Sequence, residues 1–164
     1  MAKKTSIASG ENAQPADQEV DFNTLERRRR DQRLDGLKIV VVEDTPDARN
    51  LIGRYLTNAG ASVFAAASAK EARELLERFE PDAIISDIGM PDEDGISFIE
   101  TLRESEKSLG VHVPAIALTA FIGLEHRSLT FRAGFDEHLC KPVAPETLID
   151  AILRVILNDR SAVH

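Results

Sequence analysis

Five residues whose side chains suit phosphoryl chemistry follow short apolar runs at wide spacing. Glu43 and Asp44 come directly after "LKIVVV", Asp87 ends "DAIISD", Thr119 ends "VPAIALT" and Lys141 ends "EHLCK". Clustered carboxylates repel one another unless a hard cation takes their oxygens, and a few-carboxylate site that leaves room for water and phosphate suits Mg²⁺. A lysine and a hydroxyl can bind the oxygens of a phosphoryl group. If the fold gathers these residues, Asp87 can act as a nucleophile that forms an acyl phosphate.

The apolar runs are predicted strands of a sheet covered on both faces. They are short and nearly uninterrupted in apolar character, which is typical of parallel strands buried between helices. Amphipathic stretches of helical period separate them, and this alternation indicates βαβ units. The expected strands cover residues 37–42, 62–67, 82–87, 113–119 and 137–141.

Five helices are expected between and after these strands. Thr45 is a candidate N-cap ahead of Pro46, and Gly60 ends the first helix. Ser68 and Glu71 form a capping-box pattern at the start of the second helix. Apolar periodicity predicts the remaining helices around residues 96–102, 124–133 and 145–156. The predicted fold is therefore α/β, a doubly wound five-stranded parallel sheet of the (βα)5 type.

Ligands of such open sheets bind beyond the carboxyl ends of the strands, near the point where the strand order reverses. The five polar residues all follow strand ends, so we expect them to converge there. Taken alone, Glu43 and Asp44 could be an acidic pair at a helix N-terminus. Thr119 could equally be a strand-end hydroxyl, and Lys141 a surface lysine. Their joint placement favours one site.

Composition excludes several classes of protein. The chain has 164 residues, 43% of them hydrophobic, and a formal net charge of -8, which favours a protein or small-ligand partner over nucleic acid or an anionic membrane. It has neither an apolar run of about 20 residues, as a membrane span needs, nor a signal-peptide pattern. Cys140 is the only cysteine, which excludes an internal disulfide and a cysteine-based zinc site. We expect a cytoplasmic protein in which Cys140 is a buried, inert thiol.

The N-terminal part differs in composition from the rest. Residues 1–24 are polar and without period, which is typical of a disordered tail, and Arg27–Arg30 follow. This arginine run is either a solvated linker or short helix, or a contact for an acidic protein or nucleic acid. The expected organisation is a flexible extension over 1–35, one domain over 36–158 and a short tail over 159–164.

Four motifs in register with the predicted strand ends resemble those of a known family. "VVEDTPDA", "SDIGMPDEDG", "ALTAF" and "HLCKPV" look like the receiver domain of two-component response regulators, over about residues 36–158. The resemblance implies a flavodoxin-like, CheY-like fold with strand order 2-1-3-4-5. It also implies a phosphoacceptor that takes part only in its own phosphotransfer and dephosphorylation, and is not otherwise an enzyme.

The same resemblance assigns roles at the metal site. Asp87 is the phosphoacceptor, and Asp44 and Asp87 bind Mg²⁺ directly. Glu43 acts through a metal-bound water, and the Gly89 backbone carbonyl supplies a further ligand. Mg²⁺ is therefore the expected cofactor.

Other positions carry the response to phosphorylation. The resemblance implies that Thr119 and Lys141 contact the phosphoryl group, and that the peptide bond before Pro142 is cis. His138 stands where the family often has an aromatic residue that moves inward with the threonine, and an imidazole there could make the response depend on pH.

Two positions tune phosphate hydrolysis in the family by placing or blocking the attacking water. Here they are Gly89 and Phe121, neither of which has a polar side chain. We therefore expect slow loss of phosphate.

Expected partners also follow from the resemblance. The start of the first helix, around Ala48 and Leu51, docks a histidine kinase or a histidine phosphotransfer protein. The face of the fourth helix, fifth strand and fifth helix, with Leu129, Phe131 and His138, binds an unknown downstream protein. The sequence ends at His164 without a predicted output domain. The "GFDEHLCKPV" stretch is more similar to receivers attached to hybrid histidine kinases.

Three other functions compete with that of a receiver. A phosphatase of the haloacid dehalogenase type would need a second acid two residues after the nucleophile, where Gly89 stands. A flavodoxin-like cofactor binder would need a phosphate-cradling loop, whereas "EDTPD" would repel phosphate without a metal. A phosphate sink, or an interaction module that works without phosphorylation, remains open.

Overall fold

The computed structural model describes residues 32–120 and 123–162. Strands and helices alternate along the whole described chain. Their bounds, in order, are β1 Lys38–Val42, α2 Pro46–Asn58, β2 Ser62–Ala66, α3 Ala69–Arg78, β3 Ala83–Asp87, α4 Gly95–Leu109, β4 Ala115–Thr119, α5 Leu124–Ala133, β5 Glu137–Cys140 and α6 Pro145–Ala162.

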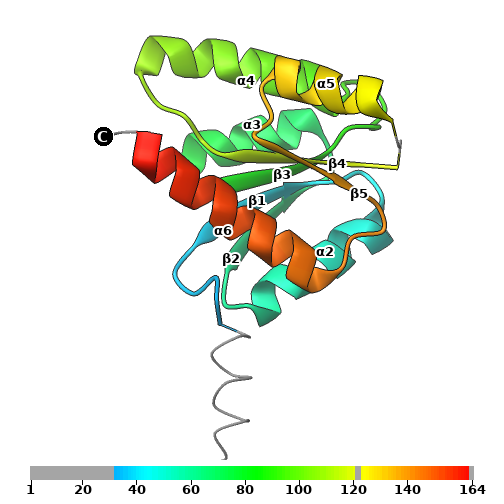
Figure 1. The fold of residues 1–164 in the computed structure, drawn as a ribbon, viewed down its shortest axis with the longest axis vertical. Helices are drawn as coiled ribbons and strands as arrows, with labels where there is room; N and C mark the ends of the chain where they lie inside the picture. The colour runs from blue at the N-terminus through cyan, green and yellow to red at the C-terminus, as the bar shows by residue number, and fades with distance from the viewer. Residues whose placement is uncertain (1–31, 121–122, 163–164) are drawn as a thin grey trace, which may run out of the picture.

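The five strands form one parallel sheet in the order β2-β1-β3-β4-β5. Helices α2 and α6 lie on one face of the sheet, and α3, α4 and α5 lie on the other (Figure 1). This confirms the predicted (βα)5 fold and its strand order. The order reverses between β1 and β3, so the carboxyl ends of these two strands flank the crevice in which ligands of such sheets bind.

The core has two layers, one on each side of the sheet. Alternate residues of a strand point to opposite faces, so Ile39 and Val41 of β1 pack toward α2 and α6, whereas Val40 and Val42 pack toward α3 and α4. Every residue of β3 and β4 is buried. This two-sided burial explains why the strands read as nearly continuous apolar runs.

Helix starts follow the predicted capping pattern in one case and depart from it in another. At α3, the Ser68 hydroxyl accepts the Glu71 amide at 3.2 Å, and the Glu71 carboxylate accepts the Ala67 amide at 2.8 Å. At α2, Thr45 is the N-cap by backbone position but makes no side-chain capping bond. The Thr45 amide instead donates to Glu43, which ties the start of α2 to the acidic strand end.

Some predicted boundaries differ from those observed. Leu34 lies within the extension expected over 1–35, yet it is fully buried against the α2 and α6 side of the core. Strand β4 begins at Ala115 rather than at residue 113, because Pro114 has no amide hydrogen for a strand ladder. Helix α6 continues to Ala162, past the boundary expected at residue 158.

The tail expected over residues 1–24 and the arginine run Arg27–Arg30 lie outside the described residues. So does Phe121, one of the two hydrolysis-tuning positions. Within residues 32–120 and 123–162, no helix is both long enough and apolar enough to cross a membrane.

Candidate acidic site at the carboxyl ends of the strands

Three carboxylates meet at the reversal point of the sheet. Glu43 and Asp44 follow β1, and Asp87 is the last residue of β3. One carboxylate oxygen of each lies within 4.8 Å of those of the other two. Glu43 is 1% exposed and Asp87 7% exposed, while Asp44 is half-buried. The fold therefore concentrates negative charge where water is partly excluded, and a nearby cation stabilises that charge.

Lys141 supplies one such cation from the far side of the sheet. Its Nζ lies 2.7 Å from Glu43 Oε2 and 3.2 Å from Asp87 Oδ1. Burial by itself would lower the pKa of Lys141, but the hydrogen bond to Glu43 and the charge of Asp87 outweigh it, so the pKa is raised above its ordinary value. The ammonium group is therefore charged at neutral pH.

The backbone fixes Lys141 in place. Its amide donates to the Thr119 carbonyl at 2.8 Å, which continues the β4–β5 pairing by one residue. The Lys141–Pro142 peptide bond is cis, as the resemblance implies. Thr119 is 1% exposed and lies opposite Cys140 in the sheet. Thr119 and Lys141 are therefore found at the carboxyl ends of two neighbouring strands.

Arg49, which sequence reasoning missed, binds the backbone of the two acidic residues that follow β1. Its Nη1 donates to the carbonyl oxygens of Glu43 at 2.9 Å and Asp44 at 3.4 Å. The guanidinium group thus holds the backbone that carries both carboxylates. Its position one turn into α2 was the available signal, since a side chain there can reach back to the preceding loop.

Gly95 was also missed, although it lies against the candidate acceptor. A Cβ at this position would come 2.4 Å from the Asp87 carbonyl oxygen and 2.9 Å from Ile88 Cα. Its amide donates to the Ile88 carbonyl at 2.9 Å. Only a glycine allows α4 to start this close to the end of β3. The signal in the sequence is the Asp-Gly pair that opens the helix.

Gly89 lies beside the Asp87 side chain. Its amide donates to Asp87 Oδ1 at 3.4 Å, and a Cβ at Gly89 would meet no atom within 4 Å. Gly89 is exposed, so the space that a side chain would fill at this position is open to water.

His138 lies in β5 opposite Ala117 of β4. Its Nε2 is buried and has no hydrogen-bond partner within the described residues. Burial lowers the pKa of His138 and the charge of Arg127 adds to this, while Glu137 opposes it. The imidazole is therefore held in its neutral form.

One sequence prediction was wrong. Cys140 is exposed, not buried. It is the last residue of β5, and β5 is an edge strand whose residues are only partly covered. The apolar neighbours along the chain suggested burial, but an edge position leaves one side of the strand open.

The predicted docking residues are accessible. Leu51 on α2 is 49% exposed, and Leu129 and Phe131 on α5 are 49% and 40% exposed. Ala48 is half-buried in the first turn of α2.

The donor set fits a hard divalent cation. It consists of carboxylate oxygens, with no sulfur or imidazole in the cluster, which suits Mg²⁺. Both oxygens of Glu43 already accept hydrogen bonds, one from Lys141 and one from the Thr45 amide. This agrees with a role for Glu43 through water, and leaves Asp44 and Asp87 as the residues that would hold the ion.

Fold and site together define the class of protein. The sequence pattern of the response regulator receiver domain matches residues 39–153. The chain therefore belongs to the response regulator receiver family of two-component signalling.

Individual relatives agree with this placement. The chain is 44% identical over 126 residues to an uncharacterized 14.6 kDa protein of Leptolyngbya boryana, covering 77% of this chain and 95% of that protein. It is 37% identical over 106 residues to the virulence transcriptional regulatory protein PhoP of Salmonella typhimurium, covering 65% of this chain but only 46% of PhoP. The chain thus spans under half the length of that regulator.

Among solved structures, the receiver domain of the sensor histidine kinase PA1611 from Pseudomonas aeruginosa has a TM-score of 0.66 and 33% sequence identity. The match covers 74% of this chain and 98% of that domain. That structure has a magnesium ion coordinated in the active-site cleft.

Proposed function

We propose that Asp87 accepts a phosphoryl group from a phosphohistidine in a Mg²⁺-dependent reaction, and that the phosphorylated chain switches a partner-binding surface. One observation carries the proposal: Asp87 Oδ1 lies 3.2 Å from the Lys141 ammonium, inside a cluster of three carboxylates at the reversal point of the sheet. Membership of the receiver family supports the same role.

The transfer forms one bond and breaks one. A carboxylate oxygen of Asp87 attacks phosphorus, the phosphorus–nitrogen bond to the donor imidazole breaks, and the imidazole nitrogen keeps the electron pair. Lys141 neutralises charge on the phosphoryl oxygens, and the Thr119 hydroxyl hydrogen-bonds to one of them. A Mg²⁺ ion held by Asp44 and Asp87, with the Gly89 carbonyl and a water bound to Glu43, would supply further charge neutralisation when bound.

Slow loss of the phosphoryl group is part of the proposal. The space beside Asp87 is open at Gly89, and no side chain there can orient an attacking water. Gly89→Asn would add an amide that can do so, and we expect it to shorten the lifetime of the phosphorylated protein. Phosphate release from purified, phosphorylated protein measures this, and a lifetime of minutes or less in the original chain would contradict the proposal.

The proposed partners follow from membership of the receiver family, and the exposed side chains of Leu51, Leu129 and Phe131 support them. The first turns of α2, with Ala48 and Leu51, dock a cytoplasmic histidine kinase or histidine phosphotransfer protein. The face of α5, β5 and α6, with Leu129, Phe131 and His138, binds a downstream protein. Inward movement of Thr119 on phosphorylation would change the surroundings of His138, because β4 and β5 are neighbours in the sheet.

The first test is the intact mass of the protein after incubation with Mg²⁺ and acetyl phosphate. We expect one phosphoryl adduct that needs Mg²⁺ and is absent from Asp87→Asn. If the original chain forms no adduct, even with a phosphorylated histidine donor, the fold serves as a binding module and the proposal fails. If the adduct forms but changes binding to no partner, the chain acts as a phosphate sink.

A further inference from the structure

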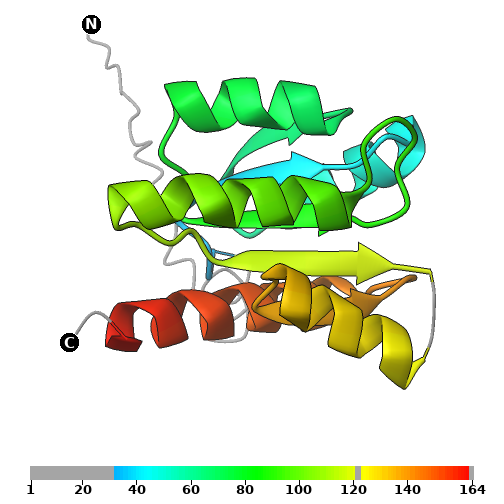
Figure 2. The same cartoon turned by 90° about the horizontal axis from the view of Figure 1, so that it is seen from above.

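A groove of about 800 Å³ lies between α3 and α4, away from the acidic site. Two large apolar side chains at its end are exposed, Leu109 at 74% and Val111 at 53%. Helices in this fold run antiparallel to the strands, so the ends of α3 and α4 lie at the edge where the strands begin (Figure 2). The apolar lining consists of Leu76, Pro81, Leu102, Leu109, Val111 and Val113.

The charged residues of the groove leave an acidic rim. Arg73 is bound to Glu93, outside the groove. Glu77 and Glu80 are exposed, and neither has an ion-pair partner within the described residues. An apolar floor with an uncompensated acidic rim is complementary to a segment that carries apolar side chains and several positive charges.

The chain itself contains such a segment. Residues 20–30 read "VDFNTLERRRR" and combine Val20, Phe22 and Leu25 with the arginine run Arg27–Arg30. The receiver function described above does not use this segment.

The segment can reach the groove. The described chain begins at Gln32, close to the start of β1, and the backbone of Lys38 exchanges hydrogen bonds with Asp82 at 2.8 and 2.7 Å. Asp82 follows Pro81, which lines the groove. The ten residues from Phe22 to Gln32 can span about 33 Å. The two helix layers each pack about 10 Å from the sheet, so the distance from one layer to the other is about 20 Å. The segment is therefore long enough to cross from one face of the sheet to the other.

We propose that residues 20–30 bind in the groove of their own chain. Phe22 and Leu25 cover the apolar floor, and the arginine run lies along the rim toward Glu77 and Glu80. Because the segment is tethered, its effective concentration at the groove is in the millimolar range, so even a weak contact is populated. The contact does not depend on phosphorylation of Asp87.

Disulfide trapping in the full-length chain tests this contact. Asn23→Cys places a thiol between the two apolar residues of the segment, and Ser105→Cys places one on the groove wall. Cys140→Ser removes the exposed native thiol. The matched control replaces Ser105→Cys with Ser128→Cys, another exposed helical serine, on α5. We expect an intrachain disulfide that forms several-fold faster with position 105 than with position 128, at a rate independent of protein concentration.

Charge reversal separates specific docking from chance encounters. Changing Arg27–Arg30 to glutamate should slow trapping at position 105, and adding Glu77→Arg and Glu80→Arg to the same chain should restore it. Equal trapping at positions 105 and 128, or trapping insensitive to these charges, would overturn the proposal. A disulfide that forms only between chains would assign the groove to a second copy instead, which also contradicts it.

Discussion

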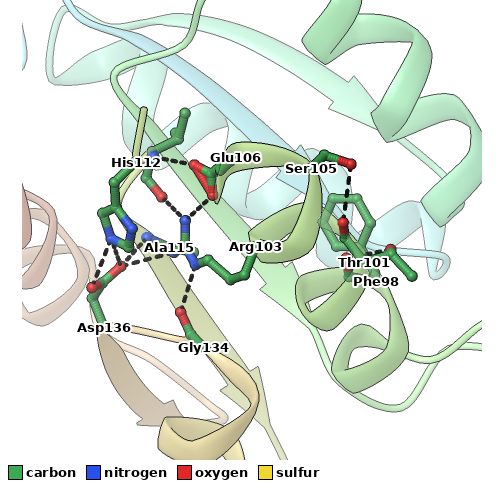
Figure 3. A network of polar contacts seen from close by, with 10 residues as sticks. Phe98, Thr101, Arg103, Ser105, Glu106, His112, Ala115, Gly134 and Asp136 are labelled. Carbon is green, nitrogen blue, oxygen red and sulfur yellow. Dashed lines mark hydrogen bonds and ion pairs between the residues drawn. The ribbon is translucent and has the colours of Figure 1, made fainter. Parts of the chain in front are cut away.

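Two cationic side chains lie at opposite ends of the strands and have different roles. Lys141 belongs to the candidate reactive site, whereas Arg103 holds parts of the fold together. Lys141 lies at the carboxyl ends of the strands, where it binds the carboxylates of Glu43 and Asp87. Arg103 lies at the other edge, on α4, surrounded by acceptors from three parts of the chain (Figure 3). The lysine faces a cluster of carboxylates that could hold a metal ion, whereas the arginine makes four hydrogen bonds to acceptors of the chain.

The Arg103 network joins α4 to the segment before β4 and to the turn between α5 and β5. Its Nε donates to the Gly134 carbonyl at 2.9 Å, and Nη1 donates to the Val113 carbonyl at 2.7 Å and to Glu106. Nη2 donates to Asp136 Oδ2 at 3.0 Å. The planar guanidinium can make these bonds at once because its donors point in fixed directions.

Asp136 extends the network to the start of β4. Its carboxylate accepts the Ala115 amide at 2.8 Å and lies 3.0 Å from His112 Nε2 (Figure 3). Each carboxylate in this network therefore bonds to at least two other groups of the chain. A network whose polar groups bond to one another stabilises one arrangement of the chain, while a cluster of like charges can bind a cation and react.

The largest effect we expect on stability comes from Arg103. Arg103→Met should lower the free energy of unfolding by about 3–5 kcal/mol, because it leaves the buried carboxylate of Glu106 without its cation. Acetyl phosphate should still phosphorylate the folded fraction. Urea denaturation and intact mass measure the two effects. The control is Lys107→Met, which removes an exposed pair with Glu104 and should cost less than about 1 kcal/mol.

The largest effect on chemistry comes from Lys141. Lys141→Met should slow phosphorylation roughly 100- to 1000-fold, as expected when one preorganised charge is removed from a reacting group. The rate of adduct formation with acetyl phosphate measures this. The comparison between the two cations fails if Lys141→Met is phosphorylated at the normal rate. It also fails if Arg103→Met is no longer phosphorylated although it remains folded.

Gly95 extends the comparison between Lys141 and Arg103, because it carries no charge and affects the site only through its packing against the Asp87 backbone. Gly95→Ala should destabilise the protein by about 1–3 kcal/mol, since the new Cβ would overlap the Asp87 backbone. It should also slow phosphorylation by displacing the acceptor. Gly53→Ala is the matched control, because a Cβ there meets no atom within 4 Å and alanine favours the helix. Equal stability of both variants would refute the steric argument.

Sequence patterns predicted the parts of the molecule that repeat a simple rule. Each strand was visible as an apolar run, and each polar residue at a strand end was expected at the same edge. Glu43, Asp44 and Asp87 do meet there, and Lys141 joins them. Parallel topology alone brings these residues together, so the prediction needed no knowledge of side-chain packing.

The rest depended on contacts that no local pattern encodes. The partners of Arg103 are separated from it by up to 33 positions, and two of them are backbone carbonyls, which leave no trace in the sequence. Exposure of Cys140 depends on which strand forms the edge of the sheet, and its apolar neighbours suggested the opposite. The clash that requires Gly95 depends on the angle at which α4 leaves β3.

His138 differs from both Lys141 and Arg103. Its Nε2 atom is buried and has no hydrogen-bond partner in the part of the chain that the structure describes. Burial, with Arg127 and His126 on α5, lowers the pKa of His138 below 6.5, and Glu137 on its own strand opposes this only in part. The unfolded chain therefore binds more protons than the folded one as the pH falls below 6.5. The stability contributed by the neutral imidazole is present above that pH and is lost as the pH falls toward the folded pKa.

His138→Phe should remove this loss, because phenylalanine fills the same half-buried position without a titrating nitrogen. We expect the variant to gain stability over the original chain at pH 5, by about 1 kcal/mol, and to gain less at pH 8. Urea denaturation at both pH values measures the difference, and NMR titration of the His138 ring measures its pKa directly. A ring pKa at or above 6.5 would show that the fold does not disfavour the charged imidazole. His138 would then resemble the hydrogen-bonded groups of the Arg103 network, and the prediction would be wrong.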